Sequence, residues 1–157
     1  GIDSAKETLS GTDAGYVAQQ ITRMEVAANQ DPELAIGTAK ELIETCCKSI
    51  LNERNMPFSK NDTLLNLVKS TVKQLKLTPG DIPNETKASK TIKKLLSNLA
   101  SITQGAAELR NEYGTGHGKL NTNKGLQSRH AKLAVGAAST VAVFLVETHQ
   151  MRKSESE

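Results

Sequence analysis

Apolar side chains recur every three or four residues along most of this chain, with polar and charged side chains between them. That spacing places the apolar residues on one face of an α-helix. It predicts helices over about residues 13–29, 32–54, 60–75 and 86–113. The residues expected to face inward in these four helices are Val17, Ile21, Met24 and Ala28; Ala35, Ala39, Leu42, Ile43, Cys46 and Ile50; Leu65, Val68, Val72 and Leu75; and Ile92, Leu95, Leu96, Leu99, Ile102, Ala106 and Leu109.

Polar residues, prolines and glycines mark where these helices begin and end. Thr12 or Asp13 is suited to cap the first helix, and Asp31-Pro32-Glu33 is a strong start signal for the second. Aspartate accepts hydrogen bonds from unpaired amides, proline fits the first helical position, and glutamate complements the helix dipole. We expect the third helix to begin within residues 59–62, and residues 78–84 have the composition of a turn.

A fifth helix is predicted from Arg129 to about Met151, with Ser128 as its cap. Its centre, Leu133–Val146, is apolar almost all round, and its 14 residues are fewer than the roughly 18 to 20 needed to cross a bilayer. We therefore interpret it as a buried core helix of a soluble protein that has no membrane association.

No stretch of the chain alternates between apolar and polar residues as a half-buried strand does. The expected fold class is therefore all-α, an antiparallel bundle of about five helices. The sequence divides into three parts. Residues 1–12 are expected to be disordered or left over from cloning, residues 13–151 to form the helical domain, and residues 152–157 to form a charged tail.

Composition restricts the chemistry that the chain can perform. Two Tyr, two Phe and no Trp predict an aliphatic core without aromatic platforms on which bases stack. Cys46 and Cys47 are adjacent, which is neither a Cys-x-x-Cys spacing nor a long disulfide loop, so we interpret them as buried reduced thiols of a cytoplasmic protein. With three His and no clustered acidic residues, we expect no metal site and no cofactor.

Positive charge is concentrated in one part of the chain. Residues 84–132 hold nine Lys or Arg against three Glu, although the whole chain has a net charge of only +3. Lys87, Lys90, Lys93 and Lys94 form either a solvated helix face or a patch that attracts anions. A polyanionic substrate is compatible with both readings.

The strongest candidate for chemistry is the segment Arg110–Gly118, where a helix is expected to end in a glycine-rich loop. Arg110 falls at the helix end, and His117 follows seven positions later between Gly116 and Gly118. Glycines allow the imidazole to fold back over the guanidinium. Arginine is a fixed cation suited to phosphate, and histidine exchanges a proton near neutral pH. The pair suits cleavage of an RNA phosphodiester without metal, with His117 as acid or base and Arg110 stabilising transition-state charge.

Neighbouring residues are assigned supporting roles. Asn111 can orient the imidazole or a phosphate oxygen, and Tyr113 can pack or donate a hydrogen bond. The run Gly114–Lys119 resembles the phosphate loop of nucleotide hydrolases, but it follows no predicted strand, and Leu120 stands where that loop has Ser or Thr. We therefore favour RNA over nucleotide hydrolysis, with the amides of the glycines and Lys119 as phosphate contacts.

Arg129 and His130 open the last predicted helix. An arginine opposes the dipole at a helix N-terminus, so a specific partner is expected for it. The alternatives are a supporting or RNA-binding role, and a structural contact with the motif loop or Glu112. His149 near the end of the same helix has an ordinary dipole explanation and is assigned no role.

The Arg110 and His117 pair resembles the Arg-x(4–6)-His signature of the HEPN superfamily, with six intervening residues and the Arg-Asn opening frequent there. More closely, the chain resembles the abortive-infection C-terminal (Abi-C) branch, over about residues 16–148. The blocks that carry this resemblance are, in order, Asp31–Ile36, Ala39–Glu44, Lys48–Leu51, Leu109–Asn111, Gly116–Gly118 and Ser128–Val135.

The resemblance implies an HEPN-like helical bundle that commonly dimerises, with Arg110 and His117 of both copies lining one cleft. It implies metal-independent endoribonuclease activity in abortive infection or in toxin–antitoxin phage defence. The implied partners are RNA, a second copy of the chain, and an antitoxin or partner domain. The alternative is a non-catalytic HEPN module for dimerisation or RNA sensing within a larger defence protein.

Overall fold

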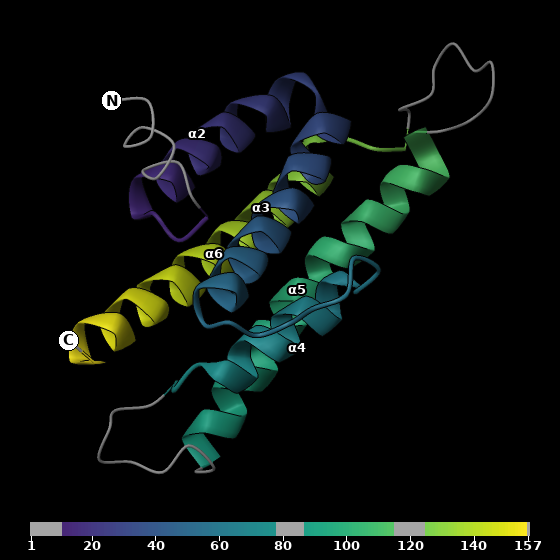
Figure 1. Cartoon of the computed structure of the whole chain (residues 1–157). Coiled ribbons are helices and arrows are strands. Elements are labelled where there is room, and N and C mark those ends of the chain that lie inside the picture. The colour runs from purple at the N-terminus through teal and green to yellow at the C-terminus, as the bar shows by residue number, and fades with distance from the viewer. Residues whose placement is uncertain (1–10, 78–86, 115–124, 157) are drawn as a thin grey trace.

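The computed structural model describes residues 11–77, 87–114 and 125–156, and within these ranges every regular element is a helix. The helices are α2 (Ala14–Gln30), α3 (Pro32–Glu53), α4 (Leu64–Gln74), α5 (Lys87–Gly114) and α6 (Ser128–Ser156) (Figure 1). This confirms the expected all-α bundle of five helices.

Three of the helices begin at capping residues. The Oδ1 atom of Asp13 accepts a hydrogen bond from the Tyr16 amide at 2.9 Å, and Asp31 accepts one from the Leu34 amide at 3.2 Å. The sequence predicted both of these helix starts, and the structure confirms them. The third helix begins later than expected, because the side chain of Thr63 accepts from the amide of Asn66 and α4 starts at Leu64.

The order of the helices in space follows from their connections. In Figure 1, α2 and α3 run in opposite directions across the short turn at Asp31, and α5 and α6 are also antiparallel. By contrast, α3 and α4 run in the same direction, because residues 54–63 cross back over the bundle between them. Asn55 lies at the start of that crossing with a φ of 56°, a left-handed conformation that asparagine tolerates better than most residues.

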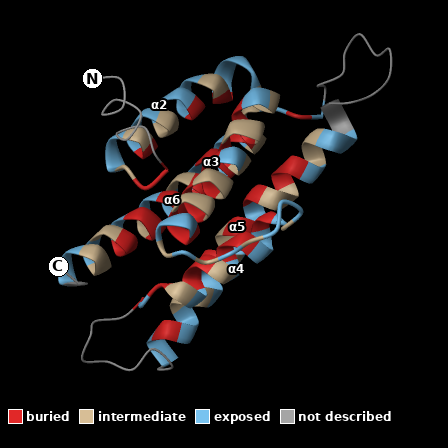
Figure 2. Ribbon diagram, in the orientation of Figure 1, coloured by how far each residue is buried: buried red, intermediate tan, exposed pale blue. Residues whose placement is uncertain are grey.

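Helix α6 is the central helix of the bundle and packs against α2, α3 and α5. Much of its length is coloured as buried in Figure 2. Ala131, Ala134, Val141 and Leu145 on this helix are fully buried. By length and composition α6 is the one described helix that is able to cross a membrane, and 56% of its apolar window is buried inside the bundle. Its place in the core accounts for its apolar composition.

The inward faces of the first two helices are largely as predicted, but those of α4 and α5 are partly wrong. Leu65, Leu95 and Ile102 were expected inside and are 39%, 57% and 37% exposed. Leu64 and Thr103 are buried in place of Leu65 and Ile102, whereas Leu96, which was expected inside together with Leu95, is buried as predicted. Where two adjacent residues both fit an apolar stripe, packing against the other helices decides which of them faces inward.

Both ends of the helical domain extend further than the sequence indicated. Gly11 and Thr12 are buried, and the side-chain amide of Gln150 donates to the Thr12 carbonyl at 2.6 Å. At the other end, α6 continues to Ser156, so most of the expected tail is helical. The side chain of Arg152 holds this last turn by donating to the carbonyl of Lys76 at 2.7 Å.

The two cysteines are free thiols on α3, and both are fully buried. Burial raises the pKa of each thiol to about 12, and in Cys46 the neighbouring Cys47 adds to the effect. A thiol reacts as its thiolate, so neither side chain is reactive in the folded protein. This confirms their interpretation as buried thiols of the core.

Candidate functional site

The structure describes part of the predicted motif. Arg110 and Asn111 lie in the last turns of α5, where Arg110 is half-buried and Asn111 is exposed. The backbone of Tyr113 is helical. The predicted site residues that lie outside the described residues are Gly116, His117, Gly118 and Lys119.

The guanidinium of Arg110 lies against α3 at Gly37. A Cβ atom placed on Gly37 would be 2.7 Å from the Nη1 atom of Arg110, closer than a real Cβ contact. Glycine in a helix interior is less favourable than alanine by about 1 kcal/mol. The missing side chain at Gly37 therefore leaves the space that the Arg110 guanidinium occupies. Sequence analysis did not single out Gly37, although a glycine in the middle of a strong helical pattern was the available signal.

The acidic residue next to the motif lies on a different side of α5. Glu112 is exposed and follows Arg110 by two residues. At 3.6 residues per turn, two residues correspond to about 200° around the helix, so the two side chains do not face each other. The carboxylate of Glu112 is therefore directed away from the place where Arg110 lies.

Arg129 and His130 form hydrogen bonds with a neighbouring residue at the start of α6. The Nδ1 atom of His130 accepts a hydrogen bond from the Gln127 amide at 2.9 Å, and Arg129 donates to the side-chain oxygen of Gln127. His130 thus occupies the place that Glu or Gln has in a capping box. Ser128 was expected to cap this helix, but its hydroxyl donates to Oδ1 of Asn29 on α2 at 2.8 Å instead.

These features share one end of the bundle. The end of α5, the start of α6 and the turn between α2 and α3 all lie at the same end in Figure 1. The described contacts of Arg110 and of Arg129 are made with different partners, Gly37 and Gln127. Two arginines are therefore presented at this end, separately anchored, on the helices that flank the segment containing His117.

A second polar cluster lies at the opposite end of α6. The Nε2 atom of His149 is 2.7 Å from Oε2 of Glu53, and Nε of Arg54 donates to Nδ1 of His149 at 3.2 Å. Because Nδ1 accepts a hydrogen bond, the proton of the imidazole is on Nε2, which donates a hydrogen bond to Glu53. The imidazole is therefore neutral. Arg54 also donates to the Gln74 carbonyl at 3.0 Å, and Lys153 pairs with Glu53 at 3.2 Å.

Burial governs the protonation of His149, which is only 1% exposed. Burial lowers the pKa of this imidazole, and its hydrogen bond to Glu53 opposes that effect only in part. The net pKa of Glu53 is lowered. Burial alone would raise it, but the hydrogen bonds from His149 and Lys153 outweigh the effect of burial. The dipole explanation of His149 was therefore wrong, since the residue joins the ends of α3 and α6. The available signal was its spacing from Leu145 and Val146 on the apolar face.

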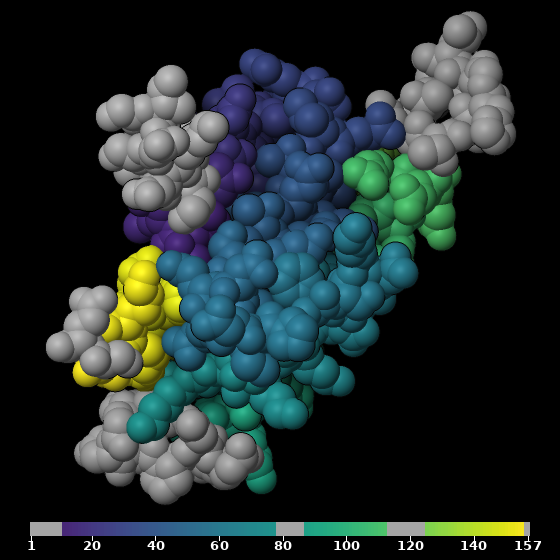
Figure 3. Space-filling view, in the orientation of Figure 1, coloured from purple at the N-terminus to yellow at the C-terminus, as the bar shows by residue number. Residues whose placement is uncertain are grey.

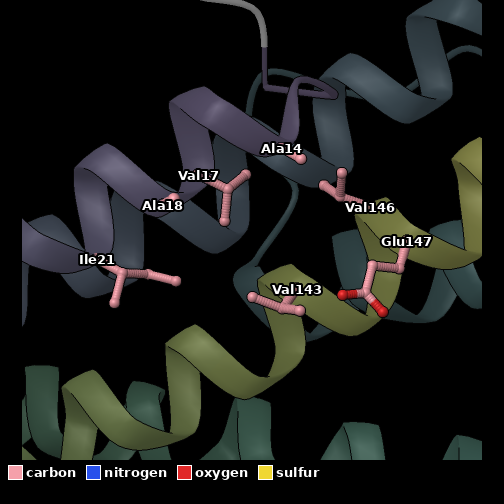
Figure 4. A pocket seen from close by; sticks show the side chains of 7 residues that line it. All are labelled: Ala14, Val17, Ala18, Ile21, Val143, Val146 and Glu147. Atoms are coloured by element: carbon pink, nitrogen blue, oxygen red, sulfur yellow. The ribbon is translucent and has the colours of Figure 1, made fainter.

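An apolar pocket of about 220 Å³ lies between α2 and α6. Figure 4 shows Val17, Ile21, Val143 and Val146 around it, with Glu147 as the charged member of its lining. A carboxylate repels phosphate, so this pocket is not suited to an RNA backbone. Among the residues that the structure describes, no group of three or more His, Cys, Asp or Glu is placed to hold a metal ion.

A family model described as HEPN-like domain, Abi_C, matches residues 14–149. The comparisons with curated proteins and with solved structures gave no match. The matched residues run from the start of α2 into the last turns of α6 and include both Arg110 and His117. Because the match covers most of the chain and the fold is an all-helical bundle, the chain belongs to the HEPN-like Abi_C family.

Proposed function

We propose that this chain is a metal-independent endoribonuclease of the HEPN type that acts in abortive infection or toxin–antitoxin phage defence. The observation that carries the proposal is the position of Arg110. Its guanidinium is seated against Gly37 at the end of α5, directly before the segment that contains His117. An arginine held in this way supplies a fixed positive charge, and His117, seven residues later in the sequence, is the residue proposed to transfer protons.

The proposed reaction needs two proton transfers. A base removes the proton from a ribose 2′-hydroxyl, and the oxygen attacks the adjacent phosphorus. The bond from phosphorus to the 5′ oxygen then breaks, and an acid protonates that oxygen. His117 takes one of these roles, and Arg110 stabilises the charge that builds up on the phosphate oxygens. The products carry a 2′,3′-cyclic phosphate and a 5′-hydroxyl.

We propose further that two copies of the chain form one site. A dimer brings two copies of His117 together, so that one serves as base and the other as acid. Leu34 supports an interface at this end, because it is 57% exposed and lies one turn before Gly37 on α3. RNA in the cytoplasm is the proposed substrate, and an antitoxin or partner domain is the proposed regulator.

Incubation of the purified chain with total RNA in EDTA tests the proposal. We expect cleavage by the parent chain and none by His117→Ala or Arg110→Ala. Arg23→Ala is the matched control, because Arg23 is an exposed arginine on α2. Circular dichroism establishes that each variant is folded. Equal cleavage by the parent chain and His117→Ala would refute the enzyme.

The same experiment distinguishes the non-catalytic alternative. If the chain is a dimerisation or RNA-sensing module, it binds RNA or itself while none of the variants changes the RNA fragments. End-group analysis adds a second criterion. Cyclic phosphate ends are expected from the 2′-hydroxyl mechanism, and 3′-hydroxyl ends would rule out that route.

A further inference from the structure

A basic cleft lies between α4 and α5, away from the motif. It encloses about 290 Å³ and is lined by Lys69, Val72 and Lys73 of α4 and by Lys93, Lys94 and Ser97 of α5. Figure 3 shows α4 and the first part of α5 on the outer surface of the bundle. Its floor includes the buried Val72, and Lys69, Lys73 and Lys94 are exposed on its walls.

The charge pattern of the two helices is one-sided. Helix α4 contains no acidic residue, and α5 contains none before Glu108. An ordinary solvated helix face alternates positive and negative residues, which then form pairs at spacings of three and four. Here Lys69 and Lys73 are four residues apart, as are Lys90 and Lys94, so lysines face lysines within each helix. Such like-charge pairs destabilise a helix by roughly 0.2–0.5 kcal/mol each.

We infer that this lysine cleft binds the phosphate backbone of RNA as a second site, separate from the motif. The inference rests on the proposed nuclease function for the choice of RNA as the polyanion. Phosphates at the cleft offset the repulsion between lysines and release counterions, which gives affinity without sequence preference. The apolar floor accommodates the sugar, and the exposed ammonium groups reach the phosphates.

The distance between the two sites sets a length requirement. Lys94 and Arg110 are 16 residues apart on α5, which corresponds to about 24 Å along the helix axis and about 160° around it, so a strand that reaches both has to pass around α5. At about 3.4 Å per nucleotide, a stacked strand needs about seven nucleotides to cover the distance along the axis. The lysine cleft therefore holds long substrates on the protein and contributes nothing to the cleavage of shorter ones.

Binding of a 2′-O-methyl oligouridine of about 20 nucleotides tests the inference by fluorescence anisotropy. This probe lacks the 2′-hydroxyl, so its binding is measured whether or not the chain cleaves RNA. The test variant is Lys73→Gln/Lys94→Gln, with one change in each wall. Its matched control is Lys48→Gln/Lys60→Gln, which removes the same charge from α3 and from residues 54–63.

Removing two phosphate contacts reduces the slope of log affinity against log salt by about 1.4, and the affinity by about 25-fold near 0.1 M salt. We expect this loss for the test variant and less than about a two-fold loss for the control. Equal affinities of the test variant and the parent chain would overturn the inference, and so would equal losses in both variants. Polyglutamate that binds as tightly as the RNA would also overturn it, because the cleft would then select acidic protein.

Cleavage supplies an independent criterion. With a substrate of about 20 nucleotides, the test variant is expected to lose kcat/KM in proportion to its loss of binding. With one of two or three nucleotides, which is too short to reach both sites, it is expected to match the parent chain. A similar loss on both substrates would contradict a separate site. If the parent chain binds RNA through the lysines but does not cleave it, the proposed nuclease activity is refuted and the inference of RNA binding at the lysine cleft still holds.

Discussion

Gly37 lies in the interior of α3, and the guanidinium of Arg110 occupies the space beside it. The substitution Gly37→Ala adds one methyl group there and improves the helix propensity of α3. Alanine is favoured over glycine in a helix interior by about 1 kcal/mol. For a domain of this size, that change raises the melting temperature by roughly 2–4 °C.

The cost of the added methyl group falls on Arg110 alone. The new Cβ would lie 2.7 Å from Nη1, while ordinary contacts begin at 3.4 Å, so the guanidinium has to retreat by the difference of about 0.7 Å. The end of a flexible side chain makes this shift with little loss of stability. A misplacement of 1 Å in an active site can cost a factor of about 100 in rate. We therefore expect kcat/KM for RNA cleavage to fall by roughly 10- to 100-fold.

Gly105→Ala is the matched control. Gly105 is also inside a helix, but apart from its two chain neighbours and the backbone of its own helix, no atom lies within 4 Å of the position that its Cβ would take. It should raise the melting temperature as Gly37→Ala does and leave cleavage unchanged. Melting temperatures from circular dichroism and initial rates on a fluorescent RNA are the two measurements needed.

Two results would refute this reasoning. If Gly37→Ala cuts RNA as fast as the parent chain, the contact with Gly37 does not position a reactive arginine. If it lowers both the melting temperature and the rate, the added methyl group disturbs the packing of α3 and not Arg110 in particular. A stable protein with a lower rate is the expected result, and only an effect confined to Arg110 produces it.

Three further predictions concern the core, the protonation of His149 and the proposed interface. Burial lowers the pKa of His149 below its ordinary value of 6.5. Below that pH the unfolded chain binds more protons than the folded chain, so the free energy of unfolding decreases as the pH is lowered from about 7 to about 5. Urea denaturation should show a smaller fall for His149→Gln; an equal fall would contradict the assignment. Iodoacetamide should modify Cys46 and Cys47 only after denaturation, as mass spectrometry can establish. Leu34→Glu should convert a dimer to a monomer in light scattering, whereas Leu95→Glu, at the same 57% exposure, should not.

Local signals in the sequence were sufficient to locate the five helices, although the start of the third was placed too early. Asp13 and Asp31 cap α2 and α3 as predicted, because capping depends on a few residues next to each other in the chain. Which residues of an apolar stripe face the core depends less on neighbours in the sequence. Leu95 and Leu96 both fit the stripe of α5, and only contacts with distant helices decide that Leu96 is buried.

The candidate site was predictable only in part, because some of its contacts join residues that are far apart in the sequence. The motif places Arg110 at a helix end, and the structure agrees. Its partner Gly37 is 73 residues earlier in the chain, and no local pattern connects the two. The same is true of His149 and Glu53, which are 96 residues apart and share a hydrogen bond. Pairs of this kind come from the packing of α3 against α5 and α6.

Several features of this chain reduce the stability of the free bundle and become favourable beside a polyanion. Gly37 weakens α3 but leaves space for the Arg110 guanidinium. Lysines that face lysines weaken α4 and α5 but attract phosphate. Arg129 opposes the dipole of α6, although Gln127 partly satisfies it. A purely structural explanation has to treat each feature as a separate accident. Because local rules are most often broken at functional sites, the proposed binding of RNA would explain them together.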